Sequence, residues 1–133
     1  MLGTNYYKYY DEDIAVPFDG WETQTFVPSF EKFMFQYNVF QNRNGNDCNK
    51  QAAYGKSVAS IMYAQTNPET FNSGISVGSF FYVTRGGTFH VINVIITYNS
   101  TVNGYIVSFY DPEIHKMVFL DAEEKEAGLE LSF

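Results

Sequence analysis

The sequence contains a single cysteine, Cys48, in the stretch Asn46-Asp47-Cys48-Asn49-Lys50, where a polar loop is expected to give way to a helix. A β-prone run farther along the chain carries His90, and the β-prone run after that ends at Asp111. Thiol-based catalysis needs a nucleophile, a base and a group that orients the base. A thiol at a helix start, an imidazole on a strand and a carboxylate on the next strand could fill these three roles. The order of these residues therefore predicts thiol-based catalysis.

The surroundings of Cys48 favour a reactive thiol. Asp47 is expected to cap the helix, so that Cys48 is its first residue. The unpaired amides and the dipole at a helix N-terminus favour the ionised, nucleophilic form of a thiol. Cysteines are more often buried and inert, but the polar residues on both sides of Cys48 argue against a deep apolar site.

The identity of the orienting acid depends on the register of a predicted hairpin. If the strands on either side of residues 99–104 pair about residue 101, position 90 lies opposite residues 111 to 113. If Asn103-Gly104 formed a two-residue type I′ turn, position 90 would face Met117 instead. The first register is the one we predict.

In that register, Asp111 or Glu113 could reach the imidazole from the neighbouring strand. An Asp-Pro pair such as Asp111-Pro112 is also an ordinary way to begin a turn. We predict Asp111 as the acid and keep Glu113 as the alternative.

Acyl transfer also needs hydrogen-bond donors for the developing oxyanion. The backbone N–H of Cys48 at the helix start is one candidate. A side-chain amide in the preceding loop is expected to supply the second, with Gln41 as the first choice and Asn42 or Asn46 next.

The pattern around these residues predicts an α+β fold. Helix formers and an apolar face extend from Cys48 to about Gln65, and a weaker helical pattern begins at Ser29. The second predicted strand is apolar on both faces, as expected at the centre of a sheet. We predict one helix that carries the cysteine and packs on a twisted antiparallel sheet, with strands at 77–84, 88–98, 105–111 and 116–120.

The chain is long enough for one domain at 133 residues, and its 45% hydrophobic and 19% aromatic content argues against disorder. We divide residues 1–133 into a peripheral arm (1–40), a catalytic core (41–120) and a tail (121–133). The tail is expected to be a solvated helical turn or a closing edge strand.

Charge and composition argue against certain partners and cofactors. Fifteen acidic and eight basic residues give a net charge of −7, which disfavours nucleic acid and anionic membranes as partners. Because the first seven residues do not resemble a signal peptide and no apolar run reaches ~18 residues, we expect a soluble protein. With one cysteine and two histidines, no disulfide, metal centre or other cofactor is expected.

Three short motifs together resemble the small papain-like cysteine peptidase domains. They are Asp47-Cys48 at a helix start, the strand Gly87-Thr88-Phe89-His90-Val91-Ile92-Asn93, and the strand end Phe109-Tyr110-Asp111-Pro112-Glu113. The nearest pattern is the C-terminal protease-like domain of certain fungal agglutinins. The resemblance implies a papain-like fold and a peptidase triad of Cys48, His90 and Asp111.

The chain departs from that pattern at several positions. The agglutinin group shows His-Ala-x-Asn and an acidic-Pro-Gln strand end, where this chain has Val91 and Glu113. The group often carries acidic residues directly after the cysteine, where this chain has Asn49-Lys50. The NlpC-type cell-wall peptidases are the second resemblance, through Asp-Cys at a helix start and the glycine-led aromatic strand Gly78-Ser79-Phe80-Phe81-Tyr82.

The leading hypothesis is a papain-like thiol hydrolase that acts on a protein or peptide substrate and passes its acyl group to water or to an amine. The alternative is an inactive papain-fold module, with a binding or structural role, that recognises carbohydrate or protein through aromatic surface. A Cys48 pKa well below about 8 is expected of the enzyme, and an ordinary or raised pKa of the module.

Overall fold

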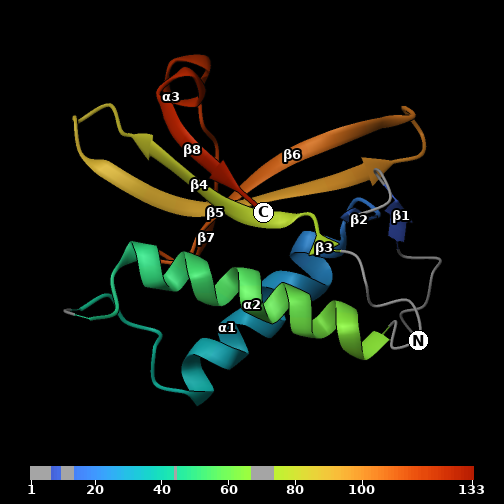
Figure 1. Ribbon diagram of the computed structural model, residues 1–133, viewed down its shortest axis with the longest axis horizontal. Helices are drawn as coiled ribbons and strands as arrows, with labels where there is room; N and C mark the ends of the chain where they lie inside the picture. Colours follow the sequence, from blue (N-terminus) through green and yellow to red (C-terminus); the bar gives the residue numbers. More distant parts are fainter. Residues whose placement is uncertain (1–6, 10–13, 44, 67–73) are drawn as a thin grey trace.

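A computed structural model gives the structure of the chain and describes residues 7–9, 14–43, 45–66 and 74–133. Two helices, α1 (Val27–Gln36) and α2 (Cys48–Thr66), lie against one face of a strongly twisted sheet (Figure 1). The fold is therefore α+β, as the sequence predicted. None of the described helices is long and apolar enough to cross a membrane.

Five antiparallel strands make up the main sheet, in the order β7-β6-β5-β4-β8. Each of the four predicted strands is present, and the strand that is apolar on both faces lies at the centre. The strands are β4 (Val77–Val83), β5 (Phe89–Asn99), β6 (Gly104–Asp111), β7 (Lys116–Val118) and β8 (Gly128–Ser132).

Helix α2 begins at Cys48, the residue that the sequence predicted. Asp47 precedes it and caps it: its carboxylate accepts a hydrogen bond from the N–H of Lys50 (3.4 Å). The helix is tied to the sheet by buried Asn93 of β5, whose amide donates to the carbonyls of Ala52 (2.8 Å) and Gly78 (3.1 Å). This contact fixes the position of α2 over the central strands.

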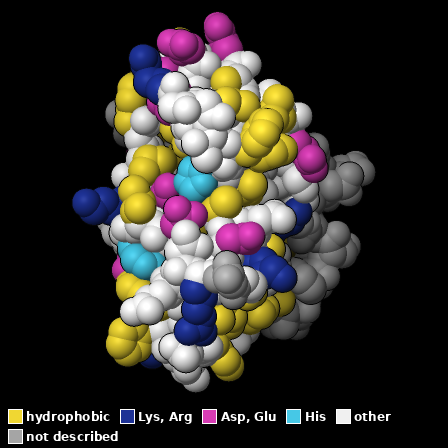
Figure 2. Space-filling view, turned by 90° about the vertical axis from the view of Figure 1, so that its left-hand side faces the viewer, with side chains coloured by type: hydrophobic (Ala, Val, Ile, Leu, Met, Phe, Trp, Pro, Cys, Tyr) yellow, Lys and Arg dark blue, Asp and Glu magenta, His cyan; other side chains and the backbone are white. Residues whose placement is uncertain are grey.

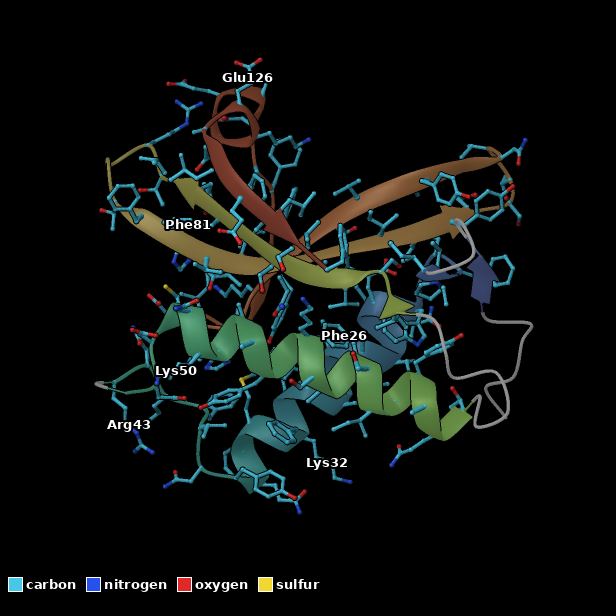
Figure 3. The ribbon with its side chains drawn as sticks, viewed as in Figure 1. Phe26, Lys32, Arg43, Lys50, Phe81 and Glu126 are labelled. Carbon is cyan, nitrogen blue, oxygen red and sulfur yellow. The ribbon has the colours of Figure 1, made fainter. Side chains whose placement is uncertain are left out.

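Part of the predicted arm, residues 1–40, contributes to the main core. Among its described residues, β1 (Tyr7–Tyr9) and β2 (Ile14–Pro17) form a small sheet with β3 (Gly74–Ile75), and a π-helical turn at Glu22–Phe26 leads into α1. Phe26 lies between the helices and the sheet (Figure 3). The prediction weighed the polar residues of this segment and missed its apolar spacing, which buries Ala15, Trp21, Phe26, Phe30 and Met34 in the main core.

A second, smaller core covers the other face of the sheet, built on Tyr82, Ile92, Val94, Phe109 and Leu120. The C-terminal tail lies beside this second core. It contains both of the structures predicted as alternatives for it, a turn of helix and an edge strand. Asp121 caps the short helix α3 (Ala122–Glu126) by accepting from the N–H of Glu124 (2.9 Å). The chain then returns as β8, which pairs with the edge of β4.

Candidate active site

The site lies where β6 separates from β5. The hairpin closes at Asn99 and Gly104, and its last pair is Asn93 with Tyr110, so the predicted register is confirmed and the type I′ turn is excluded. On the other side of β5, pairing with β4 continues to Phe89. Residues 89–92 of β5 therefore extend beyond β6, near the start of α2. Figure 3 shows Phe81 of β4 above the first turn of that helix, where Lys50 is labelled.

His90 and Asp111 are joined in this region, and the confirmed register places the two residues near each other. Nε2 of His90 lies 2.8 Å from Oδ2 of Asp111, and the two side chains are only 14% and 10% exposed. Oδ1 of the same carboxylate accepts from the N–H of Glu113 at 2.9 Å. Asp111 thus both begins a turn and holds the imidazole. A neutral His90 that donates from Nε2 keeps its lone pair on Nδ1.

Cys48 and Glu113 complete the cluster. The Cys48 sulfur, a ring nitrogen of His90 and a carboxylate oxygen of Glu113 all lie within 4.8 Å of one another. Contacts between a nucleophile and its base are often longer in a resting site than in the reacting complex. Thiol, imidazole and carboxylate are also ligand types for metal ions, so these three residues could hold one.

The ionisation of Cys48 differs from the expectation based on its place in the helix. Burial raises the pKa of the thiol, and the carboxylates of Glu113 and Asp47 raise this pKa further. The backbone N–H groups of Val91 and Asn49 act in the opposite direction. The raised pKa means that the thiol is protonated at neutral pH, and it becomes a nucleophile only when a base removes its proton.

The pKa of His90 is raised above its usual value, chiefly by the hydrogen bond to Asp111, while burial opposes this shift. The pair contributes stability that is complete below the unfolded pKa of about 6.5 and is lost as the pH rises through the folded pKa. His90 is therefore a base whose proton affinity is set by Asp111.

Replacing Asp111 by asparagine should lower the pKa of His90 toward its ordinary value, because the amide oxygen keeps the hydrogen bond but removes the negative charge. Titration of the imidazole ring protons by NMR measures the shift. Urea unfolding at several pH values should also show a weaker stability gain at acidic pH. Glu126→Gln, on α3, is the matched control, and an unchanged His90 titration in Asp111→Asn would contradict the assignment.

A pocket with a volume of about 390 Å³ opens beside the cysteine and the histidine. Figure 2 shows the corresponding side of the molecule, where histidine and acidic side chains lie together between apolar patches. The pocket therefore offers a substrate both apolar and polar side chains. It is lined by Cys48, Asn49, Ser79, Phe81, Phe89, His90, Val91, Glu130 and Ser132.

The predicted oxyanion donor Gln41 is not among these lining residues. Its side chain is exposed, and its carbonyl accepts a hydrogen bond from the amide of Asn46 (2.7 Å). Asn46 also donates to the carbonyl of Val39 (2.8 Å), so this amide holds the loop together. The side-chain amide that does line the pocket belongs to Asn49.

The walls of the pocket were not predicted from the sequence. Ser79 and Phe81 share one face of β4 because side chains alternate along a strand. Glu130 and Ser132 line the same pocket because β8 pairs with β4. This pairing connects distant segments of the chain, so no local sequence pattern predicts it. Glu113 was predicted as an alternative partner for His90, but in the structure it also approaches the thiol.

Comparison with known proteins gives no relative from which a role for these residues could be transferred: no protein-family model matches the chain, and no curated protein matches it significantly.

Proposed function

We propose that the protein is a papain-like thiol hydrolase that cleaves or transfers an amide acyl group through Cys48, His90 and Asp111. The observation that carries the proposal is a pocket lined by Cys48 and His90, with His90 held from behind by Asp111. His90 is bound to Asp111 at 2.8 Å, and its ring lies within 4.8 Å of the only sulfur nucleophile in the sequence. The burial of His90 and its hydrogen bond to Asp111 support the assignment of this imidazole as the general base.

In the proposed reaction, Nδ1 of His90 takes the thiol proton of Cys48 as the sulfur attacks the carbonyl carbon. The carbon–nitrogen bond then breaks, and the imidazolium returns the proton to the leaving amine. Water or a second amine attacks the thioester, the carbon–sulfur bond breaks, and the sulfur regains a proton. Asp111 stays ionised and supports the positive charge that His90 carries between these steps.

Stabilisation of the oxyanion is assigned to the amides at the start of α2. The first backbone N–H groups of a helix have no partner within the helix and carry the positive end of its dipole. The side chain of Asn49 lines the same pocket. We assign the second donor to Asn49 in place of Gln41, because only Asn49 is among the pocket residues.

One observation favours the second candidate function, a binding module that has kept the fold and lost the chemistry. The raised pKa of Cys48 is what we expected of such a module. The aromatic side chains of Phe81 and Phe89 at the pocket would then contact the ligand. The two candidates differ in one property: only the enzyme needs His90 to activate the sulfur.

Labelling of Cys48 by iodoacetamide in the native protein tests the proposal. At neutral pH we expect labelling, detected by mass spectrometry, to be at least ~10-fold slower in His90→Ala than in the wild type, because the protonated thiol loses its base. His115→Ala is the matched control and should label at the wild-type rate. A native Cys48 that does not react, or equal rates in wild type and His90→Ala, would favour the binding module.

A further inference from the structure

Cys48, His90 and Glu113 bring three different donor atoms close together from three parts of the fold. Cys48 begins α2, His90 lies on β5, and Glu113 lies in the turn after β6. The donor atoms lie within 4.8 Å of one another. In a tetrahedral zinc site, bond lengths of about 2.0–2.3 Å place neighbouring ligand atoms about 3.3–3.5 Å apart. Side-chain movements of roughly 1 Å therefore bring the three donors to zinc-binding distance.

We propose that Cys48, His90 and Glu113 form a Zn²⁺ site whose fourth position opens into the pocket. The sequence led us to expect no metal, because one cysteine and two histidines form no short ligand motif. The fold instead brings together three ligands that are far apart in the sequence. The proposal goes beyond the thiol hydrolase and does not depend on it.

Asp111 supplies the hydrogen bonds to the ligand residues that zinc sites usually have around the metal. Metal-binding histidines commonly donate their other ring N–H to a carboxylate, which fixes the tautomer and makes the ligand nitrogen more basic. Here Oδ2 of Asp111 holds Nε2 of His90 at 2.8 Å, which leaves Nδ1 for the metal. Oδ1 of Asp111 accepts from the N–H of Glu113 at 2.9 Å. One carboxylate therefore holds the ring of His90 and the backbone of Glu113.

The donor set and the local charge identify the kind of ion. Calcium and magnesium prefer sites made entirely of oxygen, whereas a thiolate and an imidazole suit zinc. A carboxylate oxygen of Glu113 lies within 4.8 Å of the sulfur of Cys48, and Asp47 is the residue directly before it. A divalent cation at this point would neutralise the concentration of negative charge that forms once the thiol ionises.

Binding would exchange one proton for the metal. The thiol proton of Cys48 is released to solvent, the sulfur–zinc bond forms, and the lone pair of Nδ1 of His90 is donated to zinc. The nucleophile and its base are then both occupied. In the hydrolase that we propose, zinc would consequently act as a reversible inhibitor that competes with acyl transfer.

Metal titration of the whole protein, without substrate, tests the site. After treatment with a chelator, the wild type should bind one Zn²⁺ per chain in calorimetry. Co²⁺, used as a spectroscopic substitute, should give the absorption of a four-coordinate site with a thiolate-to-cobalt charge-transfer band. Cys48→Ala should lose this band, and Glu113→Gln should bind zinc roughly 100-fold more weakly. Asp111→Asn should weaken binding about 10- to 100-fold, as removal of an outer-shell partner does.

Two matched variants control for the loss of a carboxylate or an imidazole elsewhere. Glu126→Gln on α3 and His115→Ala should both keep wild-type zinc affinity. The proposal is overturned if the wild type binds no stoichiometric zinc, if the cobalt spectrum lacks the thiolate band, or if Glu113→Gln binds zinc as tightly as the wild type. Because the readout is binding, these outcomes are independent of whether the protein turns over a substrate.

Discussion

The variant His90→Ala is expected to form an acyl-enzyme at least ~10³-fold more slowly than the wild type at neutral pH. General-base catalysis by itself contributes about 10²–10⁴-fold. Here the loss should fall toward the upper part of that range, because the raised pKa of Cys48 leaves little thiolate to react unaided. Burst release of nitrophenol from a panel of activated acyl esters measures the acylation rate directly.

Chemical rescue separates the loss of the base from a change in structure. Added imidazole should restore part of the rate to His90→Ala and should leave Cys48→Ala inactive, because only the first variant still has the nucleophile. Removal of the ring also leaves Oδ2 of Asp111 without its partner, so a destabilisation of about 1–3 kcal/mol is expected in urea unfolding. Wild-type acylation by His90→Ala would contradict the proposed mechanism.

The parts of the site that the sequence could predict are those set by short stretches of chain. Asp47 supplies the oxygen that caps α2, and this local signal located Cys48 at the first position of the helix. The hairpin between β5 and β6 is also local, because its register is fixed by the loop that connects the strands. That register is what brings Asp111 to His90.

The parts that could not be predicted depend on contacts between distant segments. The pKa of Cys48 is raised by burial and, to a smaller degree, by Glu113, which is far away in sequence, so the helix start alone does not set the direction of the shift. The wall formed by Glu130 depends on the pairing of β8 with β4. The oxyanion prediction for Gln41 was based on position in the chain, whereas the fold directs that residue away from the pocket lining.

Helix α2 approaches β5 closely at Gly55. A Cβ added at Gly55 would overlap Oδ1 of Asn93 and would stand 2.8 Å from a ring carbon of Phe30. Both neighbours are fully buried, and Asn93 is anchored by two hydrogen bonds, so neither can move freely. Cys48 lies seven residues earlier on the same helix, about two turns away.

We therefore expect Gly55→Ala to destabilise the protein by about 1–3 kcal/mol, the usual effect of overpacking a core. The sign of the change in unfolding free energy distinguishes crowding from helix propensity, because alanine otherwise stabilises a helix by about 0.5–1 kcal/mol relative to glycine. Urea unfolding measures the change. The displaced helix should also carry Cys48 away from His90 and slow iodoacetamide labelling under conditions where the variant is still folded.

Gly86→Ala is the matched control, since the nearest atom to a Cβ there is 3.8 Å away, on Thr84. It should change neither the free energy of unfolding nor the labelling rate. If Gly55→Ala were as stable as the wild type but slower to label, α2 would have shifted without loss of packing. If it were more stable and labelled normally, helix propensity would outweigh crowding. The reactivity of Cys48 would then not depend on a tight contact between α2 and β5.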